Sequence, residues 1–136
     1  MTNAVQKPSI EIFDLFDNPY PDRNYLIQHV CPEFTSLCPK TGQPDYGTLT
    51  LEYVADQKCV ELKSLKFYFQ AYRNEGIFYE AATNKILDDL VAALQPRWMK
   101  LTAAFTPRGG LHSTIVARYV APNEAGAAAE AFAREP

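Results

Sequence analysis

The order of hydrophobic periods along the chain constrains its fold more than any other feature. Two segments that alternate apolar and polar residues come first, two segments with apolar residues at helical spacing follow, and two more alternating segments come last. Alternation indicates strands, and helical spacing indicates amphipathic helices. The predicted strands are residues 25–31, 48–54, 98–105 and 111–120, and the predicted helices are residues 62–76 and 78–94. This ββααββ order predicts an α+β fold, in which a four-stranded antiparallel sheet carries both helices on one face.

Residues that stop helices mark the ends of both predicted helices. Gly76 follows the first helix, and Pro96 follows the second just after Leu94. Apolar side chains at helical spacing define the buried stripe of the first helix: Leu62, Leu65, Phe69 and Tyr72. The stripe of the second helix consists of Ile86, Leu87, Leu90, Val91 and Leu94. Each helix therefore has one apolar face for packing against the sheet.

The length of 136 residues suits a single domain with a substantial core. Residues 1–22 are rich in Asp, Asn and Pro, so we expect an irregular N-terminal arm there. Residues 23–121 contain all the predicted strands and helices and make up the domain. Residues 122–136 are rich in Ala and Glu, and we expect a frayed helix or a disordered tail.

Charge, hydropathy and cysteine usage argue against several classes of protein. The net charge of -3 argues against a general nucleic-acid-binding surface. No apolar run approaches membrane-spanning length, and the N-terminus lacks a signal-peptide pattern. Cys31, Cys38 and Cys59 have no paired spacing, which is typical of free thiols in a reducing compartment. We therefore expect a cytoplasmic protein that binds neither nucleic acid directly nor membranes.

A zinc site is the next possibility to weigh. The only two histidines, His29 and His112, could in principle surround a zinc ion together with Cys31 and Cys38. However, the sequence has no Cys-x-x-Cys or His-x-x-x-His spacing to support such a site. We expect no metal.

An open four-stranded sheet has two unpaired edges, which favour association unless they are paired or covered. A subunit with this topology can build a larger barrel by strand pairing between copies. The predicted fold therefore indicates a homo-oligomer.

One loop places a nucleophile close to an acid. Cys38 and Asp45 are seven positions apart, and Pro39, Gly42 and Pro44 limit the backbone freedom between them. A thiol is a strong nucleophile, and a carboxylic acid can deliver a proton. A stiff loop can hold both groups against one substrate atom. The alternative is an ordinary Pro/Gly loop in which Cys38 is a small buried hydrophobic residue.

A second segment offers positive charge near a helix start. Lys63 and Lys66 are three residues apart and share one helix face beside Ser64. Helix N-termini favour anions, and Arg108 with Gly109-Gly110 offers a second anion-binding turn. The alternative for the two lysines is a solvated helix face. The sequence contains no G-x-G-x-x-G, so a dinucleotide cannot be held by a Rossmann fingerprint.

Three blocks of sequence, taken together and in order, resemble a known family. They are residues 33–45 (EFTSLCPKTGQPD), residues 61–66 (ELKSLK) and residues 105–110 (FTPRGG). The chain resembles the short, single-domain class of NADPH-dependent 7-cyano-7-deazaguanine reductases, the nitrile reductases of queuosine biosynthesis. The resemblance runs from about Glu33 to Gly110. It implies the tunnelling fold shared with GTP cyclohydrolase I, which agrees with the ββααββ order.

The resemblance also implies roles for individual residues. Cys38 would add to the nitrile carbon to give a covalent thioimide, and Asp45 would protonate the nitrogen. Glu80 would anchor the purine-like base, because a carboxylate can accept two parallel hydrogen bonds from a guanine-like edge. The alternative for Glu80 is a carboxylate that complements the helix dipole, and both roles can hold together. Tyr79 replaces a histidine common in the family, and we interpret it as a residue that packs against the substrate.

Two further groups of residues follow from the resemblance. The phosphates of NADPH would be held by Lys63, Ser64, Lys66, Arg108 and Gly109. The base would be lined by Val60, Glu61 and Leu62. Family members suggest pentameric rings stacked as a decamer, with each active site at a subunit boundary.

The implied reaction is a four-electron reduction of 7-cyano-7-deazaguanine to 7-aminomethyl-7-deazaguanine, with NADPH as the reductant. Two other functions stay open at this point. A thiol-dependent nitrile hydrolase would form the same thioimide and let water attack it, although hydrolysis needs no dinucleotide phosphate site. A cyclohydrolase-like enzyme, or a zinc-free tunnelling-fold protein that only binds a purine or pterin, is the other alternative.

Overall fold

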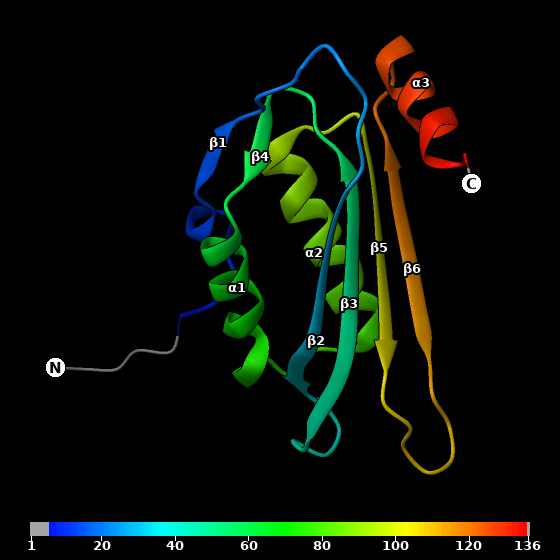
Figure 1. Cartoon of the computed structure of the whole chain (residues 1–136). Helices are drawn as coiled ribbons and strands as arrows, with labels where there is room; N and C mark the ends of the chain where they lie inside the picture. The colour runs from blue at the N-terminus through cyan, green and yellow to red at the C-terminus, as the bar shows by residue number, and fades with distance from the viewer. Residues whose placement is uncertain (1–5, 136) are drawn as a thin grey trace, which may run out of the picture.

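The computed structural model describes residues 6–135, and its largest element is a four-stranded antiparallel sheet. The strands lie side by side in the order β2-β3-β5-β6 (Figure 1). Their bounds are Ile27–Leu37 for β2, Pro44–Val54 for β3, Trp98–Phe105 for β5 and Thr114–Val120 for β6. The predicted α+β class and the antiparallel sheet are therefore confirmed.

The alternation of side chains decides which face of the sheet is buried. In β3, Leu49, Leu51 and Tyr53 are buried, whereas Thr48 and Thr50 are partly exposed. Leu49, Leu51 and Tyr53 belong to one core cluster together with the buried side chains of the two helices that lie between β3 and β5 in the sequence. The helices therefore cover one face of the sheet, as the sequence predicts.

Strands β2 and β3 are longer than the alternation predicts. A bulge after Cys31 interrupts their pairing, which resumes and runs to Leu37 opposite Pro44. The loop expected from Cys38 to Asp45 is consequently shorter, and Asp45 is a residue of β3 rather than of the loop. The alternation of apolar and polar residues does not predict this extension. A bulge places two residues of one strand opposite one residue of its partner, and this interrupts the two-residue period of the strand.

The first central helix is built in two parts. α1 (Leu62–Gln70) is followed directly by the 3-10 segment η2 (Ala71–Asn74). The stripe prediction is right for Leu65 and Phe69, which are buried. It is wrong for Leu62, whose side chain is 62% exposed. Leu62 is the first residue of the helix, and its side chain lines a surface groove instead of the core.

The second central helix, α2 (Tyr79–Leu94), agrees closely with its predicted bounds. It ends where Gln95 adopts a left-handed conformation with φ 46°, immediately before Pro96. No helix within residues 6–135 is both long and apolar enough to cross a membrane.

The N-terminal arm is more ordered than its composition suggests. It contains the 3-10 turn η1 (Ile10–Ile12) and strand β1 (Leu15–Asp17), which pairs antiparallel with β4 (Lys58–Val60). Phe13 between them is buried, and its ring centroid lies 4.5 Å from that of Tyr68. The expectation of an irregular arm is therefore wrong for these residues, because three-residue strands are too short to give a periodic signal.

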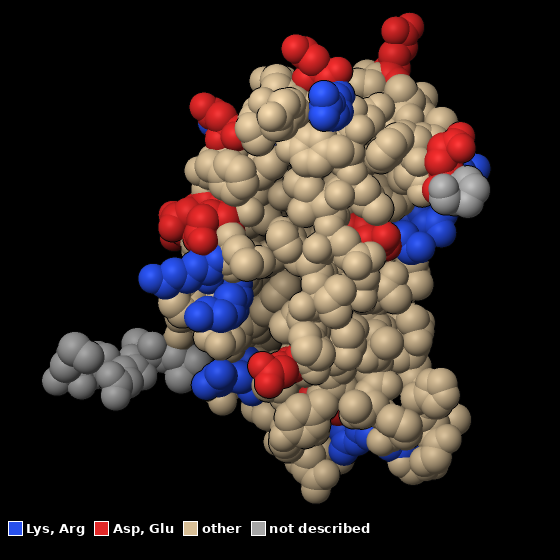
Figure 2. All heavy atoms as spheres, in the orientation of Figure 1, with Lys and Arg blue, Asp and Glu red and all other residues tan. Residues whose placement is uncertain are grey.

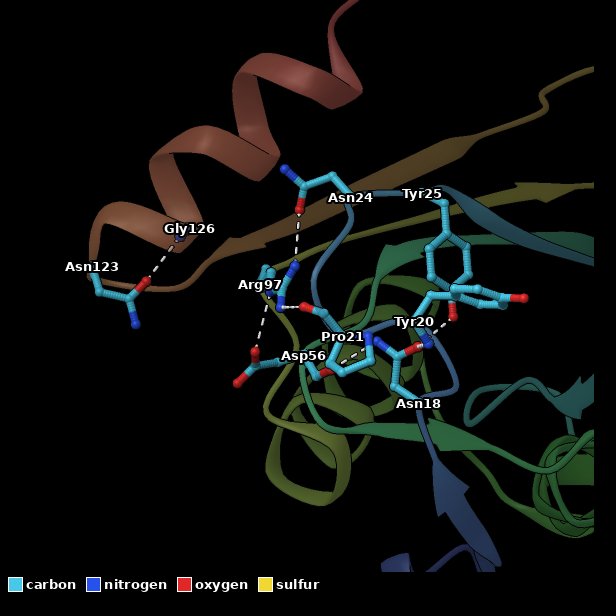
Figure 3. Close-up of polar contacts among 9 residues, drawn as sticks. All are labelled: Asn18, Tyr20, Pro21, Asn24, Tyr25, Asp56, Arg97, Asn123 and Gly126. Atoms are coloured by element: carbon cyan, nitrogen blue, oxygen red, sulfur yellow. Dashed lines mark hydrogen bonds and ion pairs between the residues drawn. The ribbon is translucent and has the colours of Figure 1, made fainter.

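Arg97 connects the segment after β1 to the end of the main sheet (Figure 3). Its Nε donates to Asp56 Oδ1 at 3.1 Å, and its Nη1 donates to Asn24 Oδ1 at 3.1 Å. Its Nη2 donates to the carbonyl of Pro21. Asn18 adds a contact to the same turn by donating from Nδ2 to the carbonyl of Asp56 at 2.8 Å. These bonds fix the path by which the chain enters β2.

The C-terminal residues form a helix, α3 (Glu124–Ala133), so the helical alternative of the tail prediction is the one observed. Asn123 caps it by accepting a hydrogen bond from the backbone N–H of Gly126 at 2.8 Å (Figure 3). Gly126 is required there, because a Cβ would lie 1.9 Å from the carbonyl oxygen of Ala121. Ala129 is fully buried and packs in a small cluster at the end of the sheet.

Candidate active site

Four predicted site residues from distant parts of the sequence meet at one end of the main sheet. Cys38 follows β2, Asp45 lies in β3, Tyr79 begins α2 and Arg108 lies in the turn between β5 and β6. The β2–β3 loop and the β5–β6 turn lie at the same end of the sheet in Figure 1. These four residues are called the Cys38 cluster below.

Backbone hydrogen bonds bring the start of α2 to this end of the sheet. Leu37 donates from its N–H to the carbonyl of Glu75 at 2.9 Å, and its own carbonyl accepts from the N–H of Ile77 at 3.1 Å. Leu37 and Gly76 thereby form a parallel bridge. Because Leu37 precedes Cys38, the bridge places the thiol loop beside the first turn of α2.

The Cys38 loop closes on itself. The N–H of Cys38 donates to the carbonyl of Gln43 at 2.8 Å, and the N–H of Gly42 donates to the carbonyl of Cys38 at 2.8 Å. Gly42 has φ 71°, a left-handed conformation that glycine adopts without strain. The loop is therefore held in one short conformation, as its Pro and Gly content predicts.

Hydrogen bonds to the sulfur favour the thiolate form of Cys38. The hydroxyl of Thr41 and the backbone N–H groups of Thr41 and Lys40 lower the pKa of Cys38. Burial and the nearby charge of Asp45 oppose this effect but do not cancel it. The side chain is half-buried rather than enclosed in the core. This environment suits a nucleophile better than it suits a small hydrophobic residue.

The carboxyl group of Asp45 is buried and held by two partners. Its side chain is 4% exposed. Oδ1 accepts hydrogen bonds from Nη1 of Arg108 and from the hydroxyl of Tyr79 at 3.3 Å. The carboxylate raises the pKa of Arg108, and burial, followed by the charge of Asp45, raises the pKa of Tyr79. Arg108 therefore stays charged, and Tyr79 stays neutral near pH 7.

The aromatic ring of Tyr79 is fixed by stacking. Its plane lies 6° from that of Phe105, with ring centroids 3.7 Å apart. Phe105 ends β5, so the sheet itself orients the tyrosine toward Asp45. The sequence alone predicts Tyr79 as a site residue and includes Phe105 in the third block, but it does not predict that the two rings stack.

Glu80 and Gly109 occupy exposed positions near the cluster. Glu80 follows Tyr79 in the first turn of α2 and is exposed to solvent. Gly109 and Gly110 have φ 59° and 83°, so the turn after Arg108 requires glycine at both positions.

A groove of about 650 Å³ lies between β2 and α1. Opposite β2, the groove is lined by the predicted site residues Glu61, Leu62, Lys63 and Lys66, by Leu65, Phe69 and Gln70 of α1, and by Arg73 of η2. From β2 it is lined by residues 29–35. Figure 2 shows basic side chains gathered over this region beside a hollow in the surface. The groove contains neither Cys38 nor Asp45.

Glu61 caps α1 and stays negatively charged. Its carboxylate accepts hydrogen bonds from the N–H of Lys63 at 2.7 Å and of Ser64 at 2.9 Å. These two bonds lower the pKa of Glu61. The Nζ atoms of Lys63 and Lys66 lie 5.8 and 5.1 Å from the centroid of the Phe67 ring, which limits their range of positions.

Two other predicted site residues lie behind the groove rather than in its lining. Val60 is 3% exposed, and its N–H donates to the hydroxyl of Tyr53 at 3.2 Å. Ser64 is also 3% exposed. Its hydroxyl accepts from the N–H of Asp14 at 2.9 Å and donates to the carbonyl of Glu61 at 2.8 Å. In this structure both residues support the position of the α1 N-terminus.

Within residues 6–135, no group of three or more His, Cys, Asp or Glu side chains is arranged to hold a metal ion. The donors considered from the sequence are dispersed instead. His29 and Cys31 lie in β2, His112 is exposed near the β5–β6 turn, and Cys38 lies in its own loop.

Proteins of one known family resemble this chain over most of its length. A family model described as "QueF-like protein" matches residues 44–124. A reductase of Rhodopirellula baltica is 60% identical over 85% of this chain and 93% of its own length. A reductase of Chlorobium phaeovibrioides is 61% identical over 82% of this chain and 96% of its own length. Both carry the name NADPH-dependent 7-cyano-7-deazaguanine reductase.

The chain belongs to the 7-cyano-7-deazaguanine reductase family. A further reductase of the family, from Nitrosococcus oceani, is 58% identical over 85% of this chain and 89% of its own length. The resemblance seen in the three sequence blocks is therefore confirmed. Among solved structures, the apo form of the archaeosine synthase QueF-Like matches with a TM-score of 0.64 at 22% identity. The match covers 68% of this chain and 91% of the archaeosine synthase chain. The two proteins therefore share a fold.

Proposed function

We propose that this protein reduces the nitrile of 7-cyano-7-deazaguanine to 7-aminomethyl-7-deazaguanine with two molecules of NADPH, in queuosine biosynthesis in the cytoplasm. The observation that carries the proposal is the Cys38 cluster in a chain of this family. Its thiol has a lowered pKa, and a buried carboxyl group lies close enough to affect that pKa. A nitrile is a weak acceptor of hydride, and thiol addition converts it into a better one.

The first step joins Cys38 to the substrate. The sulfur of Cys38 forms a bond to the nitrile carbon, and the thiol proton passes through Asp45 to the nitrile nitrogen. The product is a neutral thioimide, so atoms and charge balance. Hydrogen bonds from Thr41 and Lys40 support this step because they stabilise the sulfur as an anion.

NADPH, when bound, supplies the two hydrides that the reduction requires. One hydride at the thioimide carbon would expel the Cys38 sulfur as a thiolate and leave an imine. A second hydride at the imine carbon, with a proton from solvent at the nitrogen, would give the aminomethyl group. The imine must stay bound between the two steps, so the protein needs a firm hold on the base.

The residues present fit a phosphate-bearing dinucleotide. Lys63 and Lys66, with Arg73, make one wall of the β2–α1 groove basic. Arg108 and Gly109 provide a second basic turn beside the Cys38 cluster. Ser64 holds the start of α1, which carries both lysines, in place through its hydroxyl, while its backbone N–H is bonded to the Glu61 carboxylate.

Recognition of the base is assigned to Glu80, Tyr79 and residues 60–62. The exposed carboxylate of Glu80 can accept two hydrogen bonds from the ring N–H and exocyclic amine of the base. Tyr79 would pack against the substrate while its hydroxyl contacts Asp45. Glu61 and Leu62 would line the base, with Val60 supporting them from behind.

A complete site would need two copies of the chain. The β2–α1 groove and the Cys38 cluster share no lining residue within one chain. β2 and β6 are the two edges of the main sheet. Pairing of β2 with β6 of a second copy would close a barrel of the tunnelling-fold type and create sites at subunit boundaries. We propose pentameric rings stacked as a decamer, with no metal, membrane or direct nucleic-acid partner.

Covalent capture tests the proposal directly. The protein is mixed with 7-cyano-7-deazaguanine without NADPH, and intact-mass spectrometry should show one substrate mass added at Cys38. Addition of NADPH should then give substrate-dependent loss of absorbance at 340 nm. Cys38→Ala should lose both signals, whereas the control Cys59→Ala, outside both the groove and the Cys38 cluster, should keep them. Release of a carboxylate product without NADPH would instead identify a nitrile hydrolase.

A further inference from the structure

Ser36 carries a polar group that the folded chain leaves without a partner. Within residues 6–135, its Oγ is the only fully buried side-chain oxygen or nitrogen that makes no hydrogen bond. The side chain is 1% exposed. Burying a hydroxyl without a partner is unfavourable, and an alanine at the same position would avoid that cost. The hydroxyl therefore contributes nothing evident to the stability of this state.

The side chain of Ser36 lies beside that of Asp45 in the sheet. Ser36 in β2 is the direct cross-strand partner of Asp45 in β3. Such partners project from the same face of a sheet, with Cβ atoms about 4.5–5.5 Å apart. A small rotation of either side chain can therefore bring the hydroxyl to the carboxyl group of Asp45.

The carboxyl group has room for another partner. The bonds from Arg108 and Tyr79 both end on Oδ1 of Asp45. No hydrogen bond among residues 6–135 ends on Oδ2. The guanidinium of Arg108 is also a proposed ligand for cofactor phosphate, so the bound phosphate competes with Asp45 for it.

We propose that Ser36 is a positioning residue for Asp45. In the substrate-bound state its hydroxyl hydrogen-bonds to the Asp45 carboxyl group and fixes the orientation in which Asp45 passes a proton to the nitrile nitrogen. A hydroxyl can donate to a carboxylate and accept from a carboxylic acid, so this contact survives both protonation states. The inference rests on the proposed nitrile reduction and adds to it a residue with no direct contact to the substrate.

The test is Ser36→Ala in the full chain. Three quantities are measured: the thermal midpoint of unfolding, kcat and KM for nitrile-dependent NADPH oxidation, and the rate of adduct formation at saturating nitrile. We expect an unchanged or higher midpoint, because no hydrogen bond of the folded state is lost. We expect kcat and the adduct rate to fall roughly tenfold, with KM within about twofold, because misorientation affects the reaction more than binding.

Two matched variants separate positioning from structural support. Ser36→Thr keeps the hydroxyl, so it should retain more of kcat than Ser36→Ala even if the added methyl group lowers the midpoint. Thr83→Val removes a buried hydroxyl that does have a partner, the carbonyl of Tyr79 at 2.9 Å. It should lower the midpoint while leaving kcat close to that of the native chain.

The possible outcomes are distinct. A native kcat in Ser36→Ala would overturn the inference while the proposed function stands. A lower kcat accompanied by a lower thermal midpoint would do the same, because loss of folded protein would then explain the loss of activity. A native chain without nitrile-dependent NADPH oxidation would overturn both. Full activity in Thr83→Val with a tenfold loss in Ser36→Ala would support the positioning role.

Discussion

The guanidinium of Arg108 pairs with the buried carboxylate of Asp45 across 63 positions of sequence. Arg108 lies in the turn that the sequence predicts to bind cofactor phosphate, and its charge is balanced here by that of the proposed proton donor. The Asp45 side chain is 4% exposed, whereas that of Arg108 is 37% exposed. Arg108 is therefore the more exposed partner, and it is the one that the proposed phosphate contact would require to move.

Replacement of Arg108 should affect both binding and stability. In Arg108→Gln we expect the KM for NADPH to rise roughly tenfold, because a charge-assisted hydrogen bond to phosphate is lost. We also expect a lower thermal midpoint, because the buried carboxylate loses its charged partner. Steady-state kinetics and thermal unfolding measure the two effects. Arg134→Gln, at the exposed end of α3, is the matched control and should change neither.

Cys38 should react with thiol reagents at lower pH than Cys31. Hydrogen bonds lower the pKa of Cys38, whereas burial raises the pKa of Cys31. The thiolate is the reactive form, so alkylation of Cys38 should persist as the pH falls past the point where Cys31 becomes unreactive. Peptide mass spectrometry after iodoacetamide pulses from pH 5 to 9 measures this order.

Removal of the Thr41 hydroxyl should raise the pKa of Cys38. Its hydrogen bond is the largest cause of the lowered pKa of Cys38. In Thr41→Val the pH profile of alkylation should therefore move to higher pH, and adduct formation with the nitrile at pH 7 should slow. Identical profiles for Thr41→Val and the native chain would contradict the role assigned to this loop.

Asp45→Asn should separate proton transfer from binding. The amide keeps the shape of the side chain but cannot act as an acid, so turnover should fall about 10²–10⁴-fold. Equilibrium binding of the deazapurine should change much less. Stopped-flow kinetics and calorimetry give the two values, and near-native turnover would remove Asp45 from the mechanism.

The lysines of α1 should determine the preference for NADPH. NADPH carries a 2′-phosphate that NADH lacks, and both lysines line the basic wall of the groove. Lys63→Gln or Lys66→Gln should raise the KM for NADPH several-fold and have a smaller effect with NADH. Lys100→Gln, in β5, is the control. Equal use of both nucleotides by the native chain would contradict the assignment.

Mixed oligomers test whether sites form between subunits. Cys38→Ala and Glu80→Ala should each be inactive alone. If the two side chains at one site come from different subunits, co-refolded mixtures should regain part of the native activity. Light scattering gives the assembly size. An active monomer, or no recovery in a mixture shown to be mixed, would contradict a shared site.

The sequence by itself determined the elements and the family. Leu49, Leu51 and Tyr53 alternate in register with one face of the sheet, and this short-range pattern does not depend on the rest of the chain. The bounds of α2 and β5 follow from the same kind of local signal. The blocks around Cys38, Glu61 and Arg108 also identify the family without any coordinates, because the order and spacing of these residues are properties of the chain.

Only the tertiary structure decided which of these residues meet. The bulge in β2 extends its pairing with β3, and this moves Asp45 from a loop into a strand opposite Ser36. The Leu37–Gly76 bridge then brings Tyr79 to the same end of the sheet as Arg108. β1 and β4 pair although each has three residues, which is too few for a periodic pattern. Strand register and long-range pairing depend on how the whole sheet packs, so no local pattern encodes them.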